Sequence, residues 1–71
     1  MKNIRVAARH YQIMLENQKR AQEECKRMPN LKNIKDETIA SKVLWAFQLG
    51  LECAGILEKV EKEWRNHYES N

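Results

Sequence analysis

The side chains of this chain that are best suited to chemistry are its histidines, cysteines and tyrosines, two of each. If the chain folds as an antiparallel helical pair with its turn near Lys32, His10 would face Cys53, with Tyr11 beside them. A histidine that takes up the proton of a cysteine produces a thiolate nucleophile. A buried thiol beside a histidine is far more often structural, and no third group stands out that would orient the pair. The sequence therefore predicts a non-catalytic protein.

The spacing of the candidate ligands does not indicate a metal site. His10, Cys25, Cys53 and His67 include none of the short ligand pairs with which small domains wrap zinc. In the same helical pair the two thiols would lie about 20 Å apart along the axis, beyond the ~7 Å between α-carbons that a disulfide allows. We therefore expect no metal, no cofactor and no disulfide.

The composition is that of long helices with one interruption. The 71 residues include two glycines and one proline, and helix-favouring residues are abundant. Apolar residues recur in steps of three and four over 4–28, and Pro29 must end that helix because it lacks an amide proton. Asn33 or Asp36 is then the expected cap of a second helix. We predict one all-α domain over 1–71, an antiparallel two-helix hairpin with a long C-terminal helix: helix about 3–28, turn 29–35 and helix about 36–69.

The second predicted helix is too apolar to be covered by a single neighbouring helix. Between Val43 and Leu57 only Gln48 and Glu52 are clearly polar, and they either face solvent or line an internal polar site. This run is shorter than the roughly 20 residues that cross a bilayer, so we expect no membrane span. A chain of this size also buries only about 60% of the surface that its unfolded form exposes. We therefore expect a homo-oligomer, most simply a dimeric four-helix bundle, with an interface formed by Val43, Ala46, Phe47, Gly50, Leu51, Ala54 and Leu57.

Small residues spaced four apart characterise the centre of this expected interface. Ala46, Gly50 and Ala54 would let helix backbones approach closely, which favours a tight crossing between protomers. The alternative is a groove for the helix of another protein or for a planar ligand.

Aromatic and basic residues mark the C-terminal end as a binding surface. The second helix is longer than the first, so residues beyond about Glu61 are expected to lack an intramolecular neighbour. Trp64, Arg65 and Tyr68 lie in this segment, and Trp, Tyr and Arg are frequent anchors of protein interfaces. The leading hypothesis is a cytoplasmic protein-binding regulator or inhibitor of the kind that phages and mobile elements encode, acting stoichiometrically through these residues.

The uneven charge suggests two further hypotheses. Residues 1–35 hold nine Lys or Arg against three Glu, whereas residues 36–71 hold four against seven acids. A small anionic ligand such as a nucleotide would be held between protomers by Tyr11, Lys26 and Arg27. Nucleic-acid binding ranks third, because a net charge of +3 is small for that role and no helix-turn-helix spacing is visible.

Overall fold

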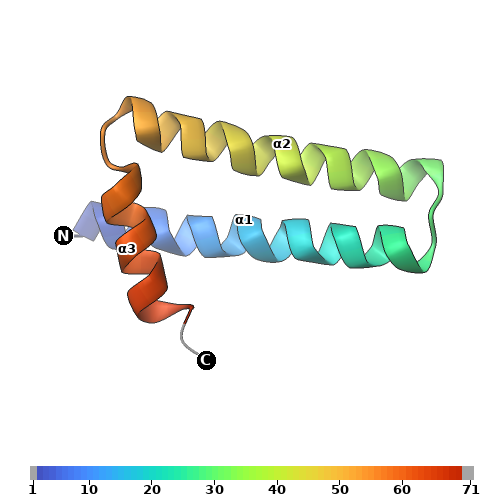
Figure 1. Cartoon of the computed structure of the whole chain (residues 1–71), viewed down its shortest axis with the longest axis horizontal. Helices are drawn as coiled ribbons and strands as arrows, with labels where there is room; N and C mark the ends of the chain where they lie inside the picture. Colours follow the sequence, from blue (N-terminus) through green and yellow to red (C-terminus); the bar gives the residue numbers. More distant parts are fainter. Residues whose placement is uncertain (1, 70–71) are drawn as a thin grey trace.

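The fold is a layer of two long antiparallel helices with a short third helix on one side. The computed structural model describes residues 2–69, and within these residues all regular structure is helical: α1 Lys2–Arg27, α2 Leu31–Cys53 and α3 Leu57–His67. The helices α1 and α2 lie side by side, and α3 crosses the N-terminal half of α1 (Figure 1). The all-α prediction is confirmed. The predicted single helix over 36–69 is wrong, because two helices occupy that segment.

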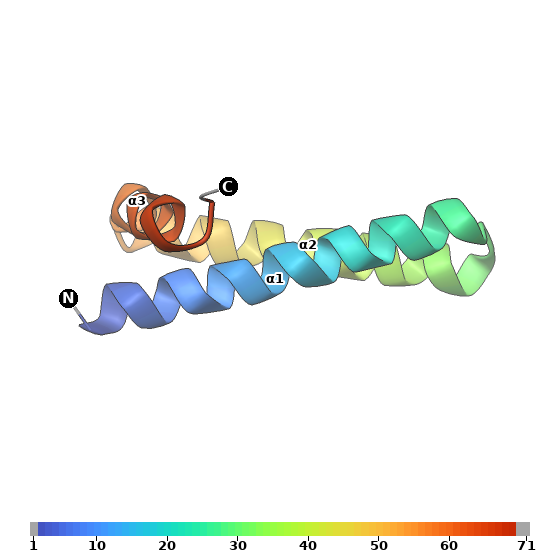
Figure 2. The same ribbon diagram turned by 90° about the horizontal axis from the view of Figure 1, so that it is seen from below.

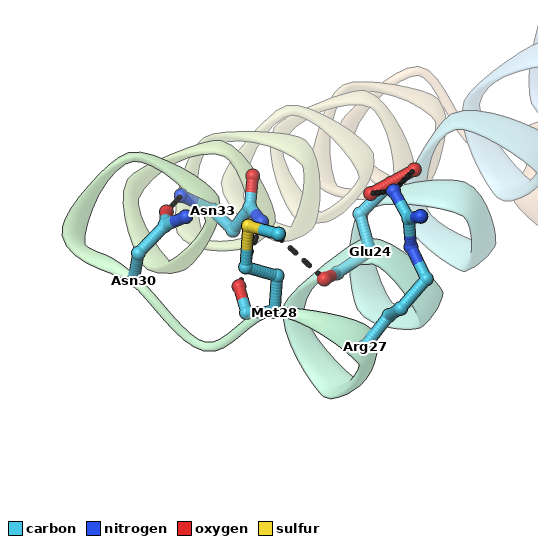
Figure 3. A network of polar contacts seen from close by, with 5 residues as sticks. All are labelled: Glu24, Arg27, Met28, Asn30 and Asn33. Atoms are coloured by element: carbon cyan, nitrogen blue, oxygen red, sulfur yellow. Dashed lines mark hydrogen bonds and ion pairs between the residues drawn. The ribbon is translucent and has the colours of Figure 1, made fainter.

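The connection between α1 and α2 is shorter than predicted. Pro29 ends α1 as expected, but α2 begins at Leu31 and is capped by Asn30, rather than by Asn33 or Asp36. The Asn30 side chain accepts a hydrogen bond from the Asn33 amide at 2.8 Å. The Asn33 carboxamide in turn donates to the Met28 carbonyl at 2.8 Å and to the Glu24 carbonyl at 3.3 Å (Figure 3). Two asparagines thereby satisfy backbone groups at the end of α1 and at the start of α2.

The early start of α2 sets which of its sides packs on α1. Hydrogen bonds link Gln48 to Tyr11 and Gln18 to Ser41, which shifts the pairing by about five residues from a turn centred near Lys32. The stripe that packs inward is consequently formed by Leu44, Phe47 and Leu51. Another stripe of α2 is exposed and consists of Ile39, Val43, Ala46, Gly50 and Cys53.

Gly55 separates α2 from α3. Its φ of +76° lies in the left-handed region, where glycine alone avoids a steric penalty from Cβ. The Ile56 amide donates to the Leu51 carbonyl and the Gly55 amide to the Glu52 carbonyl, both at 2.9 Å. This pair of bonds is a Schellman motif, and Leu51 and Ile56 belong to the same apolar cluster, as such motifs favour. The chain therefore turns at this glycine, and α3 folds back over α1.

The core forms where the three helices meet. Each helix contributes to the buried cluster, and Val60 of α3 has no exposed surface. The cluster is Ala8, Tyr11, Leu44, Leu51 and Val60, with Ile4, Ala7, Met14, Leu15, Phe47, Ile56, Leu57 and Trp64 packed around it. The molecule measures 41 × 29 × 14 Å. None of the helices in the described chain is long and apolar enough to span a membrane.

Candidate functional site

Tyr11 joins the three helices, and its hydroxyl is fully used within the chain. It donates to Glu61 Oε2 at 3.3 Å and accepts from Gln48 Nε2 at 3.0 Å. Its ring packs against Phe47 and Trp64, with centroids 6.4 and 5.6 Å away. Tyr11 is therefore a structural residue here, and its buried hydroxyl is not free to bind an anion within one protomer.

The two polar residues of the apolar run have different surroundings. Gln48 is partly buried and bonded to Tyr11, whereas Glu52 is exposed. Of the two interpretations, Gln48 therefore fits an internal polar contact and Glu52 a position facing solvent.

The C-terminal end does have intramolecular neighbours, contrary to the prediction. Trp64 is partly buried against Tyr11, and its indole N–H donates to Gln12 Oε1 at 2.6 Å. The reason is the turn at Gly55, which returns this segment to α1 instead of extending it past α1. Arg65 and Tyr68 are exposed. Partner binding through these residues stays a prediction. The Trp64 ring is partly buried against Tyr11 and is therefore less available to a partner than Arg65 and Tyr68.

A small depression between α1 and α3 contains several titratable side chains. It measures about 350 Å³ and is lined by Arg5, Ala8, Glu63, His67 and Tyr68. Glu63 Oε2 is shielded from solvent, 2.9 Å from His67 Nε2 and 3.7 Å from Arg5 Nε, yet it accepts no well-aligned hydrogen bond. Of these contacts, the one between Arg5 and Glu63 links α3 to α1. These contacts offer neither a nucleophile nor a base directed at an open substrate position.

The residues proposed for anion binding lie at opposite ends of α1. Tyr11 packs near the N-terminal half, whereas Lys26 and Arg27 form the last turn, about 22 Å away at 1.5 Å per residue. Arg27 is also paired with Glu24, with an Nη2 to Oε2 distance of 2.6 Å (Figure 3). One protomer therefore does not assemble this site, and an anion held between protomers stays a prediction.

The candidate Cys–His pair has no support in the geometry. The Tyr11–Gln48 register places Cys53 level with the segment around Val6, about one turn from His10. Both cysteines are free, Cys53 being exposed and Cys25 partly buried. Among the described residues, no three His, Cys, Asp or Glu side chains are grouped as a metal site would require.

The two thiols should differ in reactivity. Burial, and then the hydrogen bond and negative charge of Glu37, raise the pKa of the Cys25 thiol above its ordinary value. Because the thiolate is the reactive form, we expect a maleimide at pH 8 to modify Cys53 several-fold faster than Cys25. Mass spectrometry after a short pulse would measure the ratio. The same pulse in denaturant is the control and should give nearly equal rates; equal rates in the native protein would contradict the prediction.

The most distinctive surface is the apolar exterior of α2. Six large apolar side chains of this helix are exposed: Leu31, Ile34, Ile39, Val43, Trp45 and Leu49. They lie on two separate stripes, because Ile39 and Val43 are one turn apart on one side, and Trp45 and Leu49 are one turn apart on another. We call Leu31, Ile34, Trp45 and Leu49 the outer stripe.

The residues predicted for the oligomer interface fall into two groups. Val43, Ala46, Gly50 and Ala54 are exposed and available to another molecule. A Cβ added to Gly50 would meet no atom within 4 Å, so the chain itself contains no tight crossing there. Leu51 is only 8% exposed, and Phe47 and Leu57 pack against the core, because this stripe covers α1 and α3. These three residues pack within the protomer, with Leu51 buried and Phe47 and Leu57 partly buried, and a role for them in an oligomer interface stays a prediction.

The chain was compared with protein-family models, with curated proteins and with solved structures. None of the three comparisons gives a match. The basis for a function is therefore the geometry of the chain itself.

Proposed function

We propose that this chain is a non-catalytic helical protein that acts by binding other proteins as a stoichiometric regulator or inhibitor, and that it works as a homo-oligomeric helical bundle. The observation that supports this proposal is the apolar exterior of α2, where Trp45 is 63% exposed. Apolar patches that remain exposed on a protein surface mark interaction sites.

The outer stripe has the form of a helical recognition element. Leu31 and Leu49 are five helical turns apart and therefore lie in line, with Ile34 and Trp45 beside them. Such a stripe, one helix wide, fits into an apolar groove on the surface of another protein. Trp45 lies within the stripe and is of the residue type that most often dominates binding energy. We therefore propose a foreign protein with an apolar groove as the target of this stripe.

Replacing Trp45 with glutamate should weaken target binding by at least about 30-fold, or roughly 2 kcal/mol, because a charge would replace the aromatic anchor of the outer stripe. The wild-type chain would first be used as bait to capture a partner. The dissociation constant would then be measured by calorimetry with both proteins purified. Circular dichroism would check that the variant stays helical.

A matched control is Tyr68→Glu, which introduces the same charge in place of an exposed aromatic residue on the opposite side of the fold. Tyr68 is 42% exposed at the end of α3. This variant should leave the dissociation constant within about threefold of wild type. Loss of binding in Tyr68→Glu with retention in Trp45→Glu would instead assign the target to the C-terminal end. A purified partner that binds both variants normally would refute binding through either surface.

A further inference from the structure

We infer that a second copy of this chain docks on the side of the α1–α2 layer that faces away from α3, through the same side of its own layer. This inference rests on the proposed self-assembly and names the surface responsible for it. We call this side the open face, and its apolar residues are Val6, Ile13, Met14, Ile39, Val43 and Gly50.

The contacts between the helices place these residues on one side. A depression of about 260 Å³ between α1 and α2 is lined by Met14, Asn17, Asp36, Ile39, Ala40 and Val43. On α1, Val6 and Ile13 continue the stripe of Asn17 in steps of three and four. On α2, Gly50 continues the stripe of Val43 in the same way. The opposite side of α1, with Arg5, Gln12 and Glu16, borders α3 instead.

Figure 2 shows the result for the layer as a whole. Helix α3 lies on one side of the α1–α2 pair, and within residues 2–69 no helix covers the other side. Val6, Ile13, Ile39 and Val43 are all more than two-fifths exposed there. A two-helix layer that is covered on one side alone has the architecture of half a four-helix bundle.

Charge is absent from the middle of the open face, although nearly a third of the chain is charged. Along α1 the stripe from Asn3 to Asn17 carries His10 as its only titratable group. Along α2 the stripe from Ile39 to Gly50 carries no Asp, Glu, Lys or Arg. Surfaces that remain in water normally carry interspersed charges, whereas the centres of protein interfaces are depleted of them. The open face has the composition of an interface centre.

The exposed area of the chain fits a dimer of ordinary size. The accessible surface is 5642 Å², whereas a monomeric protein of this mass exposes roughly 4,700 Å². The excess of about 1,000 Å² is close to the ~800 Å² that each partner buries in a standard interface. The radius of gyration, 13.5 Å, also exceeds the ~11 Å of a compact monomer of this length. Covering the open face with a second copy would remove this excess.

The position of the apolar residues suits two-fold pairing. The Tyr11–Gln48 register places Ile13 level with Ala46, near the middle of α1. A two-fold axis through this level would superimpose the apolar centres of both copies and overlap their helices along most of their length. Ala46 and Gly50, one turn apart and both exposed, would let α2 approach its counterpart closely.

The test measures the dimer dissociation constant of the full chain by sedimentation equilibrium in reducing agent. Wild type should be a dimer at micromolar concentration. Val43→Lys should raise the dissociation constant roughly 30-fold or more, because the two-fold axis introduces the buried charge twice. Ile39→Lys should also raise the dissociation constant. Because Ile39 is 59% exposed, this variant can replace Val43→Lys in the test if Val43→Lys fails to fold. The matched control is Trp45→Lys on the outer stripe, which should leave the constant within about threefold.

Cysteine cross-linking would test the symmetry directly. In a Cys25→Ser, Cys53→Ser background, the Ile13→Cys variant should form an intermolecular disulfide on mild oxidation, because residues near a two-fold axis meet their own counterparts. The Trp45→Cys variant should not form one.

A wild-type chain that stays monomeric up to millimolar concentration would overturn the inference. A dimer that Trp45→Lys disrupts and Val43→Lys spares would also overturn it, because the copies would then meet on the outer stripe. A wild-type chain that stays monomeric would leave target binding through Trp45 open, because the calorimetric experiment measures that binding separately.

Discussion

Replacing Tyr11 with alanine should lower the free energy of unfolding by about 3–5 kcal/mol, the range for large-to-small substitutions of buried aromatic residues. Tyr11 is 6% exposed and contacts both Phe47 and Trp64. A domain of this size has a total stability of the same order. We therefore expect the variant to be largely unfolded near body temperature. Urea titration followed by circular dichroism, at one fixed protein concentration, would measure the change.

Tyr68→Ala provides the matched control, because it removes an identical side chain from the exposed end of α3. Its effect should remain within about 0.5 kcal/mol. Tyr11→Phe separates the ring from the hydroxyl, which bonds Gln48 and Glu61, and should cost about 1 kcal/mol. Similar losses for Tyr11→Ala and Tyr68→Ala would contradict the core that the structure describes.

Replacing Gly55 with alanine should destabilise the fold by about 1–2 kcal/mol, because a Cβ in the left-handed region contacts the backbone unfavourably. The φ of +76° is what directs α3 back towards α1. The variant should therefore favour the continuous helix, with Trp64 released from Tyr11. In a Trp45→Phe background, where Trp64 is the only tryptophan, this release would appear as a red shift of the fluorescence emission.

Gly50→Ala is the matched control for Gly55, measured in protein dilute enough to be monomeric. Gly50 lies inside α2, and a Cβ there meets no atom within 4 Å. Alanine should accordingly stabilise the helix by about 0.5–1 kcal/mol. Opposite signs at the two glycines are the expected outcome. A gain in stability at both would show that the turn at Gly55 does not need its left-handed conformation.

The periodicity of apolar residues predicted part of this fold, and a second sequence signal indicated the turn that the periodicity missed. The periodicity identified α1, its end at Pro29 and the extreme apolarity of α2, because these features depend on local chemistry. It could not place the end of α2, because steps of three and four continue through Gly55 without interruption. A signal was present nonetheless: a glycine followed by an apolar residue, Ile56, which meets Leu51 five residues earlier, is typical of a Schellman motif.

For the candidate surfaces, too, part could be predicted from the sequence and part could not. Exposed apolar residues on α2 were expected, and Val43, Ala46 and Gly50 are exposed. The register could not be derived, because Asn30, the observed cap, is as suitable by residue type as the predicted Asn33 or Asp36, and the choice of cap shifts every facing pair. Which stripe of a nearly all-apolar helix packs inward then depends on that shift. The contact between Trp64 and α1 depends on the turn at Gly55. It could not be predicted, because the periodicity of apolar residues did not reveal that turn.

The three-residue connection at Pro29 has a consequence for the order in which the fold forms. Contacts between α1 and α2 near this turn close short loops, whereas Tyr11 and Glu61, or Gln12 and Trp64, are about fifty residues apart in sequence. Short loops close faster and at lower entropic cost. An eleven-residue helix such as α3 is also marginal in water by itself. We therefore expect the α1–α2 pair to fold first and α3 to join it last.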